Sequence, residues 1–194
     1  MMPKITSKKY LKTGRITALF SFLIGTVIFA LYYFTSAFML LFIGYAFVVF
    51  VGILNLILLF VILARANSDS ENRAKLLKTS GLLLLNISVM LFYCWVAIVL
   101  LGTMRITFTN NTENQITDIN VVGCGGGYID QLEVGESTTV WVKIIGDCDI
   151  SIDYLYNGKR EREEVIGYVT SSMGQKWTYK ISRKNIKLVP LANL

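Results

Sequence analysis

Two cysteines, Cys124 and Cys148, are the side chains with the clearest potential chemistry, because the 194-residue chain contains no histidine. Histidine is the side chain that titrates near neutral pH and the commonest metal ligand. Its absence rules out Ser–His and Cys–His nucleophiles. We therefore expect a protein that is not an enzyme and that holds neither a metal ion nor an organic cofactor.

The spacing of Cys124 and Cys148 predicts a disulfide bond. Each cysteine adjoins a turn, so the two side chains could meet. Small domains outside the cytoplasm have marginal cores and commonly contain disulfides. Closing a loop of about 25 residues would stabilise the fold by roughly 3–4 kcal/mol on the loop-entropy model. The alternative is a pair of free, buried thiols.

The glycine-rich segment 123–127 superficially resembles a phosphate-binding loop. No Lys-Ser/Thr pair follows it, and strand signals rather than helix signals come next, so the helix N-terminus that attracts anions is missing. We interpret the segment as a loop between strands, with Gly125 and Gly126 as candidate contacts for a partner.

Trp141 is the best single candidate for a binding contact. Strand alternation places it on the opposite side from Val140 and Val142. If the two valines face the core, Trp141 is exposed, and exposed tryptophan is enriched at protein interfaces.

These residues lie in a chain whose composition predicts a membrane protein: 54% is hydrophobic and only 16% is charged. No charged residue occurs from residue 16 to residue 64, which as one helix would be ~74 Å long against a hydrocarbon core of ~30 Å. The run must fold back, and Thr35-Ser36 is the polar pair in the right place. We predict spans at about 16–34, 37–64 and, from a second uncharged run, 81–103.

The distribution of charge predicts how the chain crosses the membrane. Residues 1–15 carry +5 and the loop 65–80 carries +2, whereas residues 105–194 carry −1. Because basic flanking segments stay in the cytoplasm, we expect both basic segments there, and residues 105–194 outside the cytoplasmic (inner or plasma) membrane. Because the excess of positive charge lies entirely beside the apolar runs, it does not indicate nucleic-acid binding.

Three polar residues inside the spans predict a contact between helices rather than an ion pathway. The spans 16–34, 37–64 and 81–103 contain no acidic or basic side chain, and ion pathways use such groups. Asn55 matches Ser88 in depth better than it matches Asn86. We expect the second and third helices to touch there, through a hydrogen bond worth ~0.6–2 kcal/mol.

Residues 105–194 show the period-two alternation of half-buried strands. Seven short strands without helices predict a compact antiparallel sandwich or small barrel. The expected strands lie near 105–109, 115–122, 128–133, 138–145, 148–156, 159–169 and 176–182.

Asn157-Gly158 predicts a two-residue hairpin turn of type I′ between the fifth and sixth strands. This register places Asp153 opposite Arg162 and Ile150 opposite Val165. It also places Ile152 opposite Glu163, which puts a carboxylate on a face that should be buried. A three-residue turn with a bulge is the alternative.

We therefore expect three transmembrane helices that anchor a small all-β domain, whose function is to bind a protein partner outside the membrane or to self-associate within it. Toxin-immunity proteins and accessory subunits of membrane complexes can have such a layout, which is an analogy at the level of the fold alone. The alternative is a ligand- or stress-sensing β domain, coupled to an oligomerising transmembrane effector or pore of a defence system, with Asn55 lining the pore.

Overall fold

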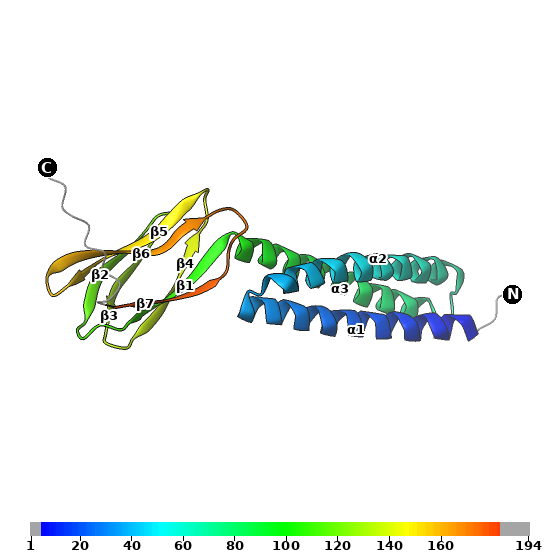
Figure 1. Cartoon of the computed structure of the whole chain (residues 1–194). Helices are drawn as coiled ribbons and strands as arrows, with labels where there is room; N and C mark the ends of the chain where they lie inside the picture. Colours follow the sequence, from blue (N-terminus) through cyan, green and yellow to red (C-terminus); the bar gives the residue numbers. More distant parts are fainter. Residues whose placement is uncertain (1–4, 183–194) are drawn as a thin grey trace. The chain divides into compact units, whose positions relative to one another are not determined.

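The computed structural model describes residues 5–182, and the surroundings of side chains from residue 8 onward. The chain divides into a helical unit, residues 1–97, and a β unit that starts at Ile98. Residues 183–194, which we assigned to the β domain, lie outside the described range. Figure 1 shows the order of elements, with three helices followed by seven strands.

Three helices are long and apolar enough to cross a membrane: α1 (Ile5–Thr35), α2 (Phe38–Ser68) and α3 (Arg73–Leu101). The turn between α1 and α2 lies at Ser36-Ala37, next to the predicted position, and Ser36 has a positive φ of 54°. The helices extend beyond the predicted spans because Lys and Arg are good helix formers. Residues 5–15 are therefore helical, and the predicted loop 65–80 shrinks to the connection 69–72.

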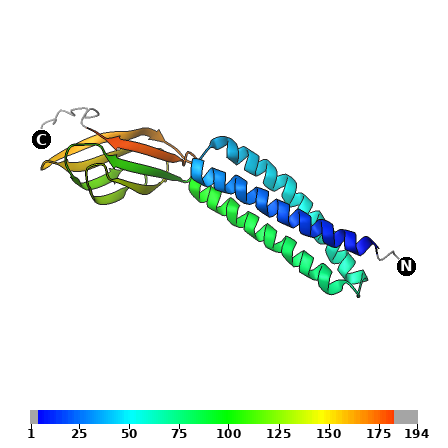
Figure 2. The ribbon, with the colours of Figure 1, turned by 90° about the horizontal axis from the view of Figure 1, so that it is seen from below.

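The three helices run side by side (Figure 2), and Gly14 of α1 lies close to both other helices. A Cβ atom at Gly14 would lie 2.6 Å from Cδ1 of Ile62 on α2 and 2.9 Å from Cγ2 of Thr79 on α3. Small residues allow such close approach of helices in membranes. The buried apolar cluster here comprises Ala18, Leu59, Ile62, Ala66, Leu76 and Leu83.

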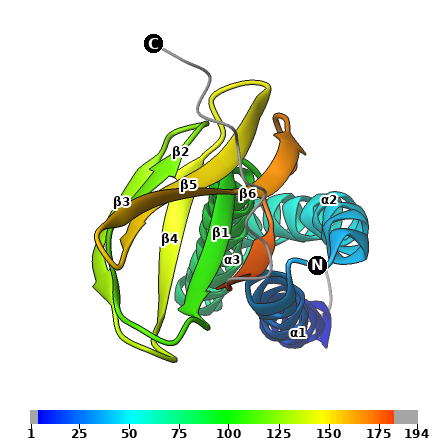
Figure 3. The ribbon, with the colours of Figure 1, turned by 60° about the vertical axis from the view of Figure 1, so that its left-hand side comes forward.

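The β unit is a sandwich of a three-stranded and a four-stranded sheet (Figure 3). Of the two predicted architectures, sandwich and small barrel, it is the first. All seven predicted strands are present, with ends shifted by at most two residues. The first sheet has the order β4 (Ser137–Lys143), β1 (Thr103–Asn110), β7 (Lys176–Ile181). The second has the order β3 (Gly127–Leu132), β2 (Ile116–Val122), β5 (Cys148–Tyr156), β6 (Lys159–Val169).

The sandwich differs from the prediction in one pairing, because β7 lies parallel to β1 and not antiparallel. The other neighbours pair antiparallel, as expected. β7 follows β6 of the other sheet through residues 170–175, so a change of sheet separates it from its partner. Local alternation cannot reveal the direction of such a long-range pairing.

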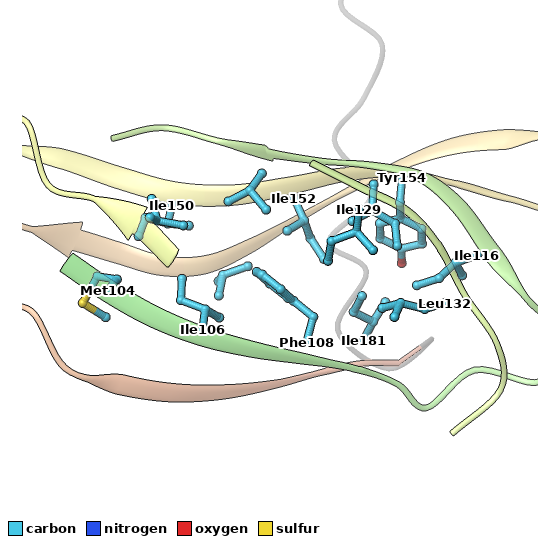
Figure 4. Close-up of a cluster of buried hydrophobic side chains, with 14 of the residues drawn as sticks. Met104, Ile106, Phe108, Ile116, Ile129, Leu132, Ile150, Ile152, Tyr154 and Ile181 are labelled. Carbon is cyan, nitrogen blue, oxygen red and sulfur yellow. The ribbon is translucent and has the colours of Figure 1, made fainter. Parts of the chain in front are cut away.

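The core between the sheets is built from the inward-facing side chains of both (Figure 4). Phe108 and Ile106 of β1 face Ile152 and Tyr154 of β5, and all four are at most 1% exposed. Alternation explains this composition, because every second residue of a strand points to the same face. The isoleucine-rich core confirms that these segments are strands buried on one side.

The hairpin register is confirmed at two of the three predicted positions. Asp153 lies opposite Arg162, and Ile152 lies opposite Glu163. Ile150, however, faces Ile166 and not Val165, because irregularities on both sides of Ile150 shift the register. Asn157 and Gly158 both have positive φ, at 51° and 75°, as a type I′ turn requires.

The β unit includes the last turn of α3, which passes into β1 through the single residue Gly102. The amide of Gly174, in the segment between β6 and β7, donates to the carbonyl of Leu101 at 2.8 Å. The amide of Ile144, which follows β4, donates to the carbonyl of Gly102 at 2.9 Å. Two segments of the sandwich thereby satisfy carbonyls at the C-terminus of the helix, which have no partner within it.

Candidate functional site

The outer face of the sheet β4-β1-β7 is the candidate site, and we call it the basic face. Its side chains are those that alternate with the core residues of the three strands. Among the described residues it carries no carboxylate and four cations, of which the three lysines are exposed and Arg105 is buried at 2% exposure. Its members are Arg105, Thr107, Thr109, Ser137, Thr139, Trp141, Lys143, Lys176, Thr178 and Lys180.

Trp141 lies on the basic face and is 50% exposed, as the alternation predicted. Val142 is fully buried and Val140 packs against the core, so the two valines point inward. The guanidinium of Arg105 lies 5.7 Å from the centre of the Trp141 ring. A stacked guanidinium restrains the indole and places a positive charge beside an apolar surface.

Two hydroxyl pairs across the strands continue the basic face beyond Trp141. The hydroxyls of Thr107 and Thr139 share a hydrogen bond of 2.8 Å, and so do those of Thr109 and Ser137. Thr178 of β7 lies beside Thr107 in the parallel register. Because each pair fixes two rotamers, the hydroxyls are held in place before any ligand arrives.

The outer face of the other sheet has the opposite charge. It carries five carboxylates and two arginines, and both arginines are engaged: Arg160 with Asp118, and Arg162 with Asp153 at 3.5 Å. Tyr128 is exposed on this face. The carboxylates are those of Asp118, Asp130, Asp149, Asp153 and Glu164.

Cys124 and Cys148 form the predicted disulfide, with a Cα–Cα distance of 5.4 Å. The glycines around Cys124 have structural roles in the same place. The amide of Gly125 donates to the carbonyl of Lys143 at 2.8 Å, and a Cβ at Gly125 would lie 2.8 Å from that oxygen. Gly126 has a φ of 64°, which a side chain would strain. The binding role that we assigned to Gly125 and Gly126 stays a prediction.

Asn55 contacts α1 and not α3. Its amide donates to the hydroxyl of Ser21 at 3.1 Å and to the carbonyl of Val51 at 2.8 Å. Ser88 turns its hydroxyl to the carbonyl of Leu84 on its own helix. The predicted contact between Asn55 and Ser88 is therefore replaced by one between Asn55 and Ser21.

Asn86 also lies away from Asn55. It lines an apolar groove of about 220 Å³ whose other lining residues belong to α1 and α3. These are Ala18, Leu19, Phe22, Leu82, Leu85 and Val89.

Glu163 is buried between the sheets, where the predicted register placed it, and it is satisfied by two tyrosines that sequence reasoning missed. The hydroxyl of Tyr154 donates to Oε1 at 2.5 Å, and the hydroxyl of Tyr179 donates to Oε2 at 2.6 Å. Burial first, then the hydrogen bond and the charge of Glu163, raise the pKa of Tyr154. This network joins β5 and β6 to β7 of the other sheet and makes the carboxylate structural.

Asn110 heads an Asn-Asn-Thr segment that matches the glycosylation pattern, but its side chain is fully buried. Its amide nitrogen donates to the carbonyls of Asn114 and Leu132, each at 2.9 Å. Its amide oxygen accepts from the backbone and the hydroxyl of Thr112. The nitrogen that a glycan would need is therefore occupied within the fold.

Within residues 5–182, no three His, Cys, Asp or Glu side chains gather in a way that could hold a metal ion. The chain matches no protein-family model, no curated protein and no solved structure. The basic face, with Trp141 on its edge strand β4, is therefore the best candidate for a functional surface.

Proposed function

We propose that this chain is a membrane-anchored, non-enzymatic binding protein. In this proposal the three helices hold the sandwich at the outer side of the cytoplasmic membrane, and the basic face binds an acidic surface of a protein partner. The observation that carries the proposal is the segregation of charge on the sandwich: among the described residues, the outward positions of β4, β1 and β7 hold cations and no carboxylate, whereas those of the other sheet hold five carboxylates.

The placement outside the cytoplasm is supported by both units. In the helical unit, the guanidinium of Arg65 on α2 lies 5.5 Å from the ring of Tyr10 on α1. The basic residues of the N-terminal segment and those around the connection 69–72 thus lie at one end of the bundle, which the positive-inside rule assigns to the cytoplasm. In the β unit, the Cys124–Cys148 disulfide is of a kind that persists in oxidising compartments.

The binding role is supported by the composition of the basic face. Tryptophan is among the residues that most often dominate the energy of protein interfaces. The exposed indole of Trp141 stacks on the buried guanidinium of Arg105, so it loses little conformational freedom on binding. The exposed lysines of the same face raise the rate of encounter with an acidic partner and disfavour basic ones.

The test is photocrosslinking in native membranes. A benzophenone amino acid replaces Trp141 in one variant of the full chain, and replaces Tyr128, an exposed aromatic residue on the acidic face, in the control. We expect a protein adduct from position 141 that is lost at high salt, and none from position 128. Equal adducts from both positions, or none from position 141, would contradict the proposal.

The topology is tested separately by protease added to sealed spheroplasts. We expect digestion of the β unit there, and protection of it in inside-out vesicles. The reverse pattern would place the sandwich in the cytoplasm and favour the alternative of a cytoplasmic sensor.

A further inference from the structure

The end of the β unit nearest to α3 carries exposed apolar residues that the proposed binding role does not use. Two segments, residues 144–147 and residues 170–175, form this end, and we call them the helix-proximal rim. Both segments are hydrogen-bonded to the helix exit, through Ile144 to Gly102 and through Gly174 to Leu101. We propose, on the basis of the membrane anchoring proposed above, that the rim is seated in the phospholipid bilayer, with Ile145 and Met173 at the hydrocarbon boundary and Lys143 among the lipid phosphates.

The position of the rim is fixed by close contacts with the last turn of α3. A Cβ atom at Gly174 would lie 2.2 Å from the carbonyl oxygen of Leu100 and 2.5 Å from that of Leu101. The hydroxyl of Thr170 donates to the carboxylate of Asp147, which ties the two rim segments together. The rim therefore stays beside the point where the chain leaves the helix.

The depth of that point follows from the length of α3. Lys78 is the last charged residue before the apolar run, and Leu101 lies 23 residues after it. The rise of an α-helix makes this segment ~35 Å long, against a hydrocarbon core of ~30 Å. The last turn of α3 thus reaches the boundary between hydrocarbon and headgroups, and the rim lies at the same level.

The side chains of the rim have the chemistry of that boundary. Ile145 is 71% exposed and Met173 is 43% exposed, although both belong to a unit with a closed apolar core. Ile145 follows Ile144, whose amide donates to the carbonyl of Gly102, and Met173 precedes Gly174, whose amide donates to the carbonyl of Leu101. The backbone of both residues is therefore held beside the end of α3. Apolar side chains gain free energy by leaving water for the acyl region.

Lys143 is placed one layer further out, because it pairs with Thr103 and so lies about 3 Å along β1 from Gly102. Lys176 and Trp141 both pair with Arg105, about 10 Å from Gly102, and therefore lie beyond the headgroups, where a protein partner can reach them. The headgroup layer is roughly 5–8 Å thick on each side, and lysine stems extend along it to reach phosphates. The carboxylate of Asp147 is occupied by the hydroxyl of Thr170.

The test measures the depth of nitroxide labels on the full chain in vesicles of phosphatidylcholine and phosphatidylglycerol. Cys94→Ala removes the free thiol while the disulfide remains. Ile145→Cys and Met173→Cys are labelled in this background. Val134→Cys is the matched control, because Val134 is also an exposed apolar residue, in the turn whose Gly135 amide donates to the carbonyl of Asn110 at the far end of β1.

We expect labels at positions 145 and 173 to be more accessible to oxygen, which concentrates in the bilayer, than to a water-soluble nickel complex. The label at position 134, about 24 Å along β1 from Thr103, should show the reverse ratio. Circular dichroism and a non-reducing gel confirm that each variant is folded and disulfide-bonded. A water-like ratio at both 145 and 173 would overturn the inference, and would leave the crosslinking at position 141 unaffected.

Discussion

Replacing Glu163 by leucine tests whether the buried carboxylate is needed only as an acceptor for two tyrosines. The substitution leaves the hydroxyls of Tyr154 and Tyr179 without the acceptors that they contact at 2.5 and 2.6 Å. A buried hydroxyl without a partner costs about 1–3 kcal/mol. Tyr154 is buried and bears the full cost, whereas Tyr179 is half-buried and bears part of it. We expect the free energy of unfolding to fall by about 2–4 kcal/mol.

The reverse perturbation should be at least as severe. Tyr154→Phe together with Tyr179→Phe removes both donors and leaves Glu163 as a buried carboxylate without them. Breaking a buried charged contact in this way typically costs about 3–5 kcal/mol. Adding Glu163→Leu to the double variant then removes the stranded charge, and we expect the triple variant to regain most of the loss.

The assay is unfolding of the full chain in detergent by guanidinium chloride, followed by tryptophan fluorescence from Trp141 and Trp177. Glu164→Leu is the matched control, because Glu164 is the neighbouring carboxylate and points to the exposed outer face. That substitution should change the free energy by no more than about 0.5 kcal/mol. A triple variant no more stable than the double variant would refute the view that satisfaction of the carboxylate governs this part of the core.

Three further predictions concern Tyr154, Gly174 and Asn55. Burial and Glu163 raise the pKa of Tyr154, so the folded state retains a proton that the unfolded chain releases above about pH 10. The free energy of unfolding should therefore fall as the pH rises beyond that value. The fall should be less steep in Tyr154→Phe. Gly174→Ala should lower the free energy of unfolding by about 1–3 kcal/mol through overpacking. Gly146→Ala is the control and should leave it unchanged, because a Cβ atom there meets nothing within 4 Å. Asn55→Leu should weaken the bundle by about 0.6–2 kcal/mol in detergent titrations. Its effect should be smaller when it is added to Ser21→Ala, since both substitutions remove the same hydrogen bond between α1 and α2.

The strands could be predicted almost residue by residue because alternation is a local property. The segments around Val140 and Ile152 repeat apolar residues at every second position, and this pattern alone marks a strand with one buried face. The parallel pairing of β7 with β1 could not be predicted in the same way. Which strands pair, and in which direction, depends on how the connection 170–175 crosses between sheets, and no local pattern records that path.

The helices show a different limit of sequence reasoning. Hydropathy marks the segment that matches the hydrocarbon core, but the helix itself continues into polar residues such as those of 73–80. The depth of Asn55 could likewise be estimated from helical rise, which suggested Ser88 as its partner. Depth leaves the rotation of each helix about its axis undetermined, and this rotation turns Asn55 toward Ser21 instead.

The candidate site could be predicted only in part, because the net charge of a segment does not show how its charged side chains divide between the two faces of a sandwich. Trp141 was found from alternation, since exposure follows directly from the burial of its neighbours. Its setting was missed because Arg105, Lys176 and Lys180 come from strands far apart in sequence and meet Trp141 on one sheet only through the pairing of β4, β1 and β7.

The net charge of −1 over residues 105–194 therefore says little about what the sandwich attracts. The two outer faces are separated by two sheets, about 10 Å apart, and by the side chains on both. At physiological ionic strength the screening length is about 8 Å. A partner approaching the basic face consequently experiences its three exposed lysines with little contribution from the carboxylates behind them. Binding through Trp141 should weaken with added salt, although the charges of the whole domain nearly cancel.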